Sequence, residues 1–185
     1  MDWHRSEETF AAKAPAIRSE RLVLEPLSLE HAEEMAPVLD DPRLHTYIGG
    51  EPLSLSQLRV RYAMLAAGPS IGVRERWLNW ILRRLSDDVA VGYVQATLTP
   101  APQGVHARVA WMVGASYQGS GYATEAARAM LDFLAERGIS QVGATIHPEN
   151  RDSIAVAIRL GMVASSDFVD GEVVWRLTSP FASGR

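Results

Sequence analysis

The chain of 185 residues contains no cysteine, which excludes a disulfide framework, a thiolate metal site and a thiol nucleophile. It also lacks any apolar run near the ~18 residues that a transmembrane helix needs, and its first eight residues are too polar for a secretory signal. Positive charge is not in excess: the net charge is −4 and the isoelectric point is near 5.7. These values argue against a general binder of nucleic acid or of anionic membranes. We therefore expect a soluble, cytoplasmic protein with neither nucleic acid nor membrane among its partners.

Metal-binding patterns are absent as well. The five histidines are scattered, and no Asp or Glu accompanies a histidine at ligand spacing. His4 lies in the N-terminal segment, and His31 and His45 are expected on helix and loop surfaces. Only His106 and His147 lie at strand ends near the motifs described below. Because no histidine has acidic residues at ligand spacing, we expect no metal.

The length fits one domain. Residues 1–17 have no convincing hydrophobic periodicity and are expected to form a loose N-terminal arm, which leaves residues 18–180 as a single domain. Alternation and helical spacing of apolar residues predict the elements, with Ser28 and a Ser54/Gln57 capping box at two helix starts. Strands are expected at 21–25, 76–85, 89–99, 105–113, 141–146 and 173–177, the last in a hairpin around 170–171, and helices at 28–39, 54–67, 122–137 and 150–160. Runs of strands separated by helices predict the α+β class, with one central strand–helix–strand unit.

The segment 119–121, Gly-Ser-Gly, stands between a strand-like run, 109–113, and the helix expected at 122–137. Such a turn can present several backbone N–H groups to one anion, and the helix N-terminus adds partial positive charge, so we predict a phosphate cradle. A P-loop is excluded because Tyr-Ala follows Gly121 where Lys-Ser/Thr is required, and a Rossmann fingerprint because Thr124 replaces its third Gly or Ala. On this motif alone, an ordinary glycine-rich turn remains the alternative.

Two signatures in order resemble a known family. Residues 118–123 follow the pattern Gln-x-x-Gly-x-Ala and resemble the coenzyme A pyrophosphate loop of the GCN5-related N-acetyltransferases (GNAT). Residues 147–162 resemble the second signature, in which a strand ends in Pro-x-Asn and a helix follows; Asn150 is a strong N-cap and Gly161 a helix stop on physical grounds alone. With the opening residues 19–27, the chain is similar to the subfamily that acetylates the N-termini of ribosomal proteins.

The resemblance implies a mixed, mostly antiparallel central sheet of about seven strands covered by about four helices. It also implies that two strands splay and that the pantetheine chain of acetyl-CoA pairs with the exposed backbone of 109–113 like an added strand. Trp111 and Met112 point to opposite faces, and one of them is expected to line the acyl pocket. The expected cofactor-binding residues are Trp111, Met112, Val113, Gln118, Gly119, Ser120, Gly121, Tyr122, Ala123, Thr124, Asn150 and Ser153.

The acid and the base of the family pattern are both missing. Ala157 stands where many relatives carry the tyrosine that protonates the leaving thiolate, and Arg108 stands where many carry a glutamate base. Ser153 stands at the spacing of a hydroxyl that faces the coenzyme sulfur in the ribosomal-protein type, so the resemblance makes it the expected acid, with a packing role as the alternative. His106 or His147, acting through water, is the expected base.

The resemblance therefore predicts an acetyl-CoA-dependent N-acetyltransferase that transfers the acetyl group directly to a primary amine, either a protein N-terminus or a small molecule. The alternative is a non-catalytic acyl-CoA-binding or interaction module. Acceptor selection is expected in 47–67 and around Trp77, and Tyr47, Trp77 and Trp80 are candidates for an acceptor pocket, although core packing is the commoner use of tryptophan. The acceptor itself carries no signal, and a homodimer is left open.

Overall fold

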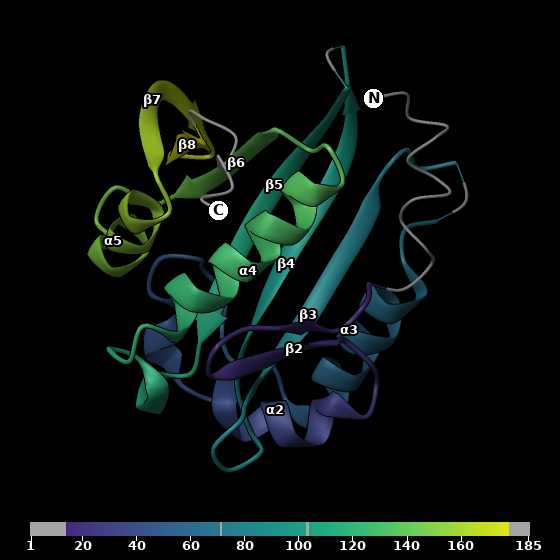
Figure 1. Cartoon of the computed structure of the whole chain (residues 1–185). Helices are drawn as coiled ribbons and strands as arrows, with labels where there is room; N and C mark the ends of the chain where they lie inside the picture. Colours follow the sequence, from purple (N-terminus) through teal and green to yellow (C-terminus); the bar gives the residue numbers. More distant parts are fainter. Residues whose placement is uncertain (1–13, 71, 103, 178–185) are drawn as a thin grey trace.

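The computed structural model describes residues 14–70, 72–102 and 104–177 (Figure 1). Its strands are β1 (Ile17–Arg18), β2 (Leu22–Pro26), β3 (Arg76–Arg84), β4 (Val89–Ala101), β5 (Gly104–Val113), β6 (Gln141–Ile146), β7 (Met162–Val169) and β8 (Glu172–Leu177). Its helices are α2 (His31–Leu39), α3 (Leu55–Ala67), α4 (Tyr122–Glu136) and α5 (Arg151–Arg159), with the 3-10 helices η1 (Pro42–His45) and η2 (Ala115–Tyr117). The α+β class is confirmed, and the short strand β1 is the one strand that the sequence did not predict.

The eight strands form one sheet in the order β1-β2-β3-β4-β5-β6-β8-β7. Neighbouring strands are antiparallel except for β5 and β6, which are parallel because α4 carries the chain back across the sheet between them. The last hairpin turns back so that β8 lies between β6 and β7. The expected mixed, mostly antiparallel sheet with a central strand–helix–strand unit is therefore confirmed.

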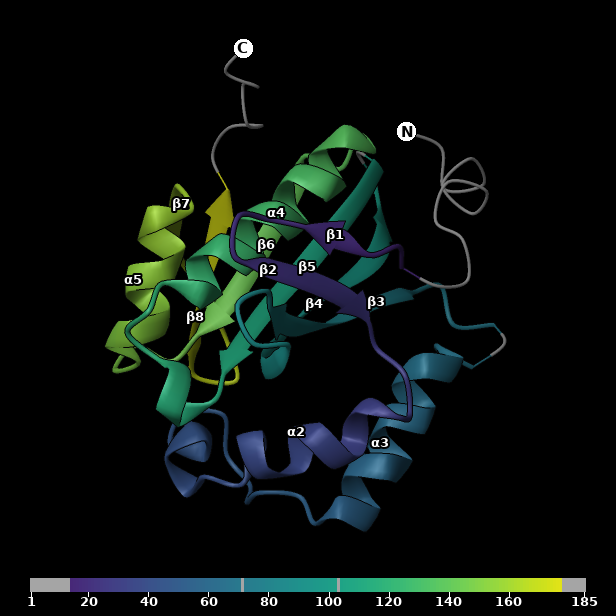
Figure 2. The same ribbon diagram turned by 60° about the horizontal axis from the view of Figure 1, so that its bottom comes forward.

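Helices cover both faces of the sheet. In Figure 2, α2 and α3 lie below the sheet and α4 lies above it. Trp80 and Ile81 are neighbours in β3 and both are fully buried, but Trp80 belongs to the core beneath α4 and Ile81 to the core against α2 and α3, because successive strand residues point to opposite faces. The Trp80 ring meets Phe133 of α4 edge to face, with centroids 5.6 Å apart. Core packing is thus confirmed for Trp80.

Capping residues define two helix starts as predicted. At α3, the Ser54 hydroxyl accepts the Gln57 N–H and the Gln57 side chain accepts the Ser54 N–H. At α5, Asn150 Oδ1 accepts the Ser153 N–H at 3.1 Å. Gly161, with φ at +82°, ends α5 in the left-handed conformation that glycine adopts without strain.

Two boundaries differ from the sequence prediction. Ser28 does not cap α2, which begins at His31; the Ser28 N–H and hydroxyl instead lie 3.0 and 2.9 Å from the His31 ring Nδ1. Strand β4 continues two residues beyond the predicted end, to Ala101, so that it pairs with β5 up to the turn. Pro100 is tolerated there because the strand is about to end, where a missing N–H disrupts little of the ladder.

The described part of the predicted N-terminal arm is packed rather than loose. Ala14 is buried, the Trp80 indole N–H donates to the Pro15 carbonyl at 2.7 Å, and Ile17 pairs with Leu24 of β2. Residues 14–17 therefore belong to the domain. The remainder of the predicted arm, 1–13, lies outside the described residues, as do residues 178–180 at the predicted end of the domain.

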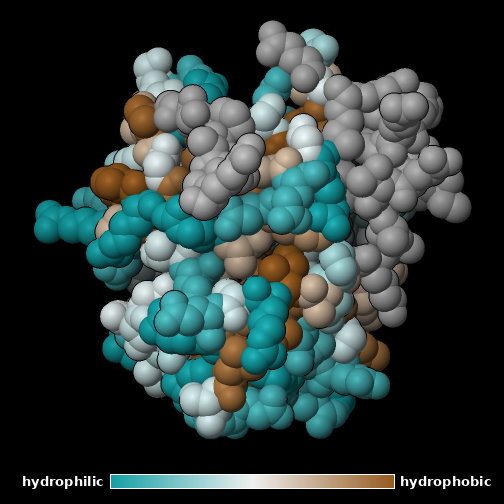
Figure 3. Space-filling model, in the orientation of Figure 1, coloured by the Kyte–Doolittle hydropathy of each residue, from teal (hydrophilic) through white to brown (hydrophobic). Residues whose placement is uncertain are grey.

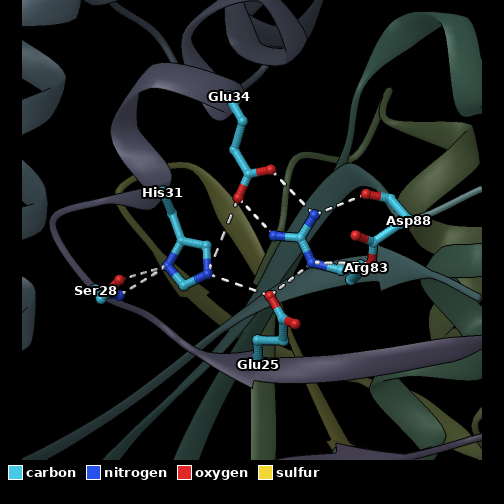
Figure 4. Close-up of polar contacts among 6 residues, drawn as sticks. All are labelled: Glu25, Ser28, His31, Glu34, Arg83 and Asp88. Carbon is cyan, nitrogen blue, oxygen red and sulfur yellow. Dashed lines mark hydrogen bonds and ion pairs between the residues drawn. The ribbon is translucent and has the colours of Figure 1, made fainter.

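An ion-pair network fastens α2 to the sheet (Figure 4). Arg83 of β3 donates to Glu25 of β2 (Nε to Oε2, 2.8 Å) and to Glu34 of α2 (Nη2 to Oε1, 2.6 Å). The bond to Glu34, opposed by burial, raises the pKa of the Arg83 guanidinium. His31 Nε2 lies 3.3 Å from the same Glu25 oxygen. The network holds α2, β2 and β3 together.

The surface is mainly hydrophilic on the face drawn in Figure 3, where hydrophobic areas are separate from one another. Four exposed apolar side chains lie on α5 and on β7, the strand at one edge of the sheet: Ile158, Val163, Phe168 and Val169. None of the helices in the described ranges is both long and apolar enough to cross a membrane.

Candidate active site

Strands β5 and β6 share only a short stretch of pairing. Their register extends over three residue pairs, from His106↔Gln141 to Arg108↔Gly143. Beyond Arg108, β6 pairs only with β8 on its other side, and no described strand lies along the β6-facing edge of 109–113. The predicted splay is therefore present, and it leaves backbone groups along 109–113 open to a ligand that adds like a strand, apart from the Val113 carbonyl, which accepts from the Gln118 side chain.

The glycine loop lies at the open end of the splay and has a series of unused N–H groups. The Gln118 N–H donates to the Ala115 carbonyl, and the Glu125 N–H donates to the Gly121 carbonyl at 3.1 Å. Between these two, the N–H groups of 119–124 have no protein acceptor in the described structure. They lie at the N-terminus of α4, where the helix dipole favours an anion. The loop fits the phosphate cradle predicted from its sequence.

The loop is shaped by its own side chains and backbone. Gln118 does not point outward: its Nε2 donates to the Val113 carbonyl at 3.1 Å and so closes the loop against the end of β5. Gly119 and Gly121 have φ of +76° and +81°, which L side chains rarely adopt. A Cβ at Gly119 would meet no atom within 4 Å, so the strain of the backbone, and not crowding, explains the glycine there.

A clamp from the start of the chain holds α4 and the loop. Glu125 Oε1 accepts the Ser19 hydroxyl and the Arg21 backbone N–H, both at 2.7 Å, and its Oε2 accepts Arg21 Nε at 2.7 Å. Arg21 Nη1 also donates to the Ser120 carbonyl at 3.0 Å. Burial opposes ionisation of Glu125, but these hydrogen bonds and the Arg21 charge together lower its pKa. The clamp joins residues 19–21 to the glycine loop and α4, two segments that resemble the family at separate places in the sequence.

Two arginines place positive charge around the loop. The Arg21 guanidinium lies 4.9 Å from the Tyr122 ring centroid, and the Arg84 guanidinium lies 5.3 Å from that of Tyr117. Arg84 is also bonded to Asp87, whose hydrogen bonds raise the pKa of the guanidinium. Both guanidinium groups therefore lie beside the cradle, on a chain whose net charge is negative.

The second segment lies after β6, beside the splay. Asn150 uses Oδ1 to cap α5, which leaves its side-chain N–H groups for another partner. The Ser153 hydroxyl has no protein partner in the described structure, and Ala157, one turn further on, is fully buried. The structure therefore brings Asn150 and Ser153 together in the first turn of α5.

The two candidate bases occupy different surroundings. His147 follows β6; its Nδ1 accepts the Glu149 N–H at 3.2 Å, and its ring lies 5.2 Å from the Tyr47 ring. His106 lies in the paired part of β5, with its ring against Gly143. Its pKa is lowered mainly by burial and further by the positive charges of Arg108 and Arg176. Within the described residues, no group of three acidic or histidine side chains could hold a metal ion.

A pocket of about 420 Å³ opens on the face of the sheet that α2 and α3 cover. Most of its lining is apolar, and it includes Leu27, Leu39, Leu44, Ile48, Leu53, Leu58, Tyr62, Leu65, Tyr93 and Met112. Its volume is in the range of small-molecule sites. Met112 belongs to the open part of β5, so the pocket and the splay share a wall.

The pocket contains part of the region predicted to select the acceptor. Residues 48–51 and 58–65 contribute to its lining, but Trp77 and Tyr47 do not. The Trp77 indole N–H donates to Glu75 instead, at 2.9 Å. Trp111, on the opposite face from Met112, packs on the core beneath α4. Of the two residues proposed for the acyl pocket, Met112 is thus the one that faces a cavity.

Sequence reasoning missed the residues that make this pocket polar. Tyr62, Asn79, Tyr93 and Gln95 line it, but each occupies an ordinary position in an amphipathic helix or strand. Their convergence depends on the register Asn79↔Gln95 and on how α3 packs, and neither leaves a local signal in the sequence.

Comparisons with known proteins agree with the signatures. The model of the acetyltransferase (GNAT) domain matches residues 21–163. An acetyltransferase structure from Agrobacterium tumefaciens str. C58 is 26% identical, with a TM-score of 0.68 and coverage of 90% of this chain and 95% of that chain. The structure of RimL, the ribosomal L7/L12 alpha-N-protein acetyltransferase, in complex with coenzyme A is similar in fold, with 16% identity, a TM-score of 0.69 and coverage of 88% and 96%.

Among curated proteins, the uncharacterized protein YkkB of Bacillus subtilis (strain 168) is 32% identical over 100 residues, which are 46% of this chain and 58% of YkkB. The chain thus matches less than two thirds of the length of that relative. The domain match covers both signatures, the splay and the loop. This chain belongs to the GNAT acetyltransferases, a family that uses acetyl-CoA.

Proposed function

We propose that the protein is an acetyl-CoA-dependent N-acetyltransferase that transfers the acetyl group directly to a primary amine. One observation carries the proposal: Met112 belongs to the open edge of β5 and also lines the pocket on the α2 and α3 face. A thioester bound along that edge would meet an amine bound in the pocket. The two substrates would then react without a covalent intermediate on the protein.

The reaction balances with these two substrates alone. The deprotonated amine nitrogen attacks the thioester carbonyl carbon, a C–N bond forms, the C–S bond breaks, and coenzyme A leaves as a thiol after its sulfur takes a proton. Holding amine and thioester in attack geometry supplies much of the rate. A backbone N–H on the open edge of 109–113 would polarise the carbonyl.

The cosubstrate contacts follow the geometry of the site. The N–H groups of 119–124, with Gln118 closing the loop, would hold the pyrophosphate, and the strand edge at 111–113 would pair with the pantetheine chain. The free side-chain N–H groups of Asn150 would donate to the pantetheine carbonyls. Together with Ser153, these residues are the cofactor-binding set predicted from the sequence.

We propose Ser153 as the proton donor to the leaving thiolate. Its hydroxyl has no competing protein partner in the described residues, and the N-terminus of α5 favours a developing negative charge at this place. The base acts through water. His106 is kept neutral by its surroundings and can accept a proton at neutral pH. His147 accepts the Glu149 N–H at Nδ1, so it would take a proton at that nitrogen only by giving up this hydrogen bond.

A second candidate function is a non-catalytic acyl-CoA-binding module. It is favoured by Ala157 and Arg108, which stand where relatives carry an acid and a base. Release of free thiol from acetyl-CoA with a panel of amines, together with calorimetry of acetyl-CoA binding, separates the two. Amine-dependent thiol release supports the transferase, binding without turnover supports the module, and absence of binding contradicts both. Cytoplasmic location and a homodimer stay predictions, to be tested by cell fractionation and analytical ultracentrifugation.

A further inference from the structure

An arginine lies on the side of α3 that faces the pocket. Four residues of this helix line the pocket, and their spacing places them on one helix face: Leu58, Arg61, Tyr62 and Leu65. The other three are apolar or aromatic, and Arg61 is exposed to solvent. Arg61 therefore brings one positive charge to an otherwise apolar face of the helix.

This arginine has no ion-pair partner among the described residues. Arg59, two positions earlier in α3, differs: its Nη2 donates to Glu33 of α2 at 2.5 Å. The lining contains one carboxylate in the described part of the chain, Glu51, which is exposed and forms no ion pair with Arg61. A guanidinium on a pocket wall without a carboxylate partner is suited to an anionic group of a ligand.

The charge of Arg61 acts on the part of the pocket next to the splay. Burial raises the pKa of the Tyr62 and Tyr93 phenols, and in both cases the positive charge of Arg61 opposes this rise. All three residues line the same pocket, so the guanidinium lies near Tyr93 of β4, which pairs directly with Met112 of β5. An anionic group bound to Arg61 would thus be close to an amine that reaches Met112 and the open edge.

Two amide side chains face the same pocket. Asn79 of β3 and Gln95 of β4 are directly opposite each other in the sheet, so their side chains project from the same face. Both line the pocket, both are partly exposed, and neither side chain hydrogen-bonds to protein in the described ranges. Their N–H groups can donate to a carboxylate, and their carbonyl oxygens can accept from an amine.

We infer that the acceptor is an amino acid with an apolar side chain, and that Arg61 selects it by binding its carboxylate. The inference rests on the proposed function, because it identifies the pocket as the acceptor site. The amine lies toward Met112, and the apolar side chain contacts the leucines of the lining. A carboxylate matches the one arginine of the lining in charge and can accept two N–H groups of its fork. The second charge of a polyamine would instead face a cation and apolar groups, where it is strongly disfavoured.

The acetylated products of leucine and leucinamide test the recognition directly. N-acetyl-L-leucine and N-acetyl-L-leucinamide have no charged amine, so they differ in charge only at the carboxyl group. Binding of each to the full chain saturated with coenzyme A is measured by calorimetry, and the corresponding phenylalanine pair is a second set. Wild type should bind the acids about tenfold or more tightly than the amides, as expected for a hydrogen bond to a charged group.

Substitutions in α3 assign this preference to one residue. Arg61→Gln should remove most of it by weakening the acids, and Arg61→Lys should keep part of it, because the charge remains but the planar fork is lost. Arg59→Gln is the matched control, since Arg59 lies on the same helix and does not line the pocket. It should keep the wild-type preference. Because Arg61 has no ion pair with a described residue, Arg61→Gln should melt at the wild-type temperature and keep its affinity for acetyl-CoA.

Thiol release from acetyl-CoA with leucine, phenylalanine and their amides tests the function separately. Equal binding of acids and amides by wild type, no binding of either acid, an unchanged preference in Arg61→Gln, or the same loss in Arg59→Gln would each overturn the inference. If the acids bind through Arg61 but no amine is acetylated, the ligand class stands and the proposed function fails. If amines are acetylated but acids and amides bind alike, the proposed function stands and the inference fails.

Discussion

Replacing Gly121 by alanine should separate acetyl-CoA binding from the stability of the fold. Gly121 has a φ of +81°, and an added Cβ would meet only Arg21 Nη2, at an ordinary contact distance of 3.5 Å. Alanine therefore fits sterically but favours a negative φ, which would turn the neighbouring N–H groups away from the phosphate position. Gly161 provides a matched control, since its φ is +82° and no atom lies within 4 Å of its added Cβ.

The magnitudes follow from this geometry. A left-handed L residue costs about 1–2 kcal/mol, so both variants should melt about 2–8 °C below wild type. Loss of one hydrogen bond to a charged phosphate costs about 1.5–3 kcal/mol, so the Kd for acetyl-CoA should rise about 10- to 150-fold in Gly121→Ala. Gly161→Ala, at the far end of α5, should keep the wild-type Kd.

Calorimetry of acetyl-CoA binding and thermal melts of the three proteins give the result directly. An equal loss of affinity in both variants would show that backbone strain acts through the whole fold. An unchanged Kd in Gly121→Ala would mean that the phosphate does not bind at this loop.

The remaining predictions concern the acid, the base and the clamp. Ser153→Ala should lower kcat by about 10²-fold with little change in KM for acetyl-CoA, and Ser153→Thr should keep most activity; full kcat in the alanine variant would leave Ser153 a packing residue. If His106 is the base, kcat/KM should rise with pH through a pKa below 6.5 because burial, Arg108 and Arg176 favour the neutral ring, and this rise should vanish in His106→Gln; its persistence there assigns the base elsewhere. Glu125→Gln should lower the free energy of unfolding by about 1–3 kcal/mol at pH 7. Because the folded-state pKa of Glu125 lies below its usual 4.5, its contribution is complete above pH 4.5 and is lost as pH falls through the lowered pKa, so a difference from wild type that persists at pH 2 would contradict the clamp.

Signals that act within a few residues could be predicted from the sequence. The Ser54 capping box, the Asn150 cap and the Gly161 stop each depend on hydrogen bonds or φ values inside one turn of helix. The glycine loop is equally local, so its position at the start of α4 followed from the sequence. Strand β1 could not be predicted from the sequence, because a strand of two residues is too short to show hydrophobic alternation. Its position depends on its pairing with β2.

Contacts between distant segments explain what the sequence did not reveal. Arg21 donates to Glu125 across more than a hundred positions of the chain. Each of the two segments resembles the family, but the sequence did not reveal that they contact each other. Alternation in β3 places Trp77 and Trp80 on opposite faces, but it does not indicate which residues on the face of Trp77 line the cavity. The register shows that the pair Asn79 and Gln95 does so, two residues along β3 from Trp77.

The short pairing between β5 and β6 divides the sheet into two blocks, β1 to β5 and β6-β8-β7, that meet directly at three residue pairs. A cosubstrate lying in the opening would bond to the first block through 109–113 and to the second through Asn150, and so would act as a missing strand of the sheet. Amide hydrogens on that open edge should then exchange rapidly in the free protein and slowly in the complex. Because Met112 on this edge also lines the proposed acceptor pocket, a bound cosubstrate would extend one wall of that pocket, and we expect acetyl-CoA to bind first and the amine second.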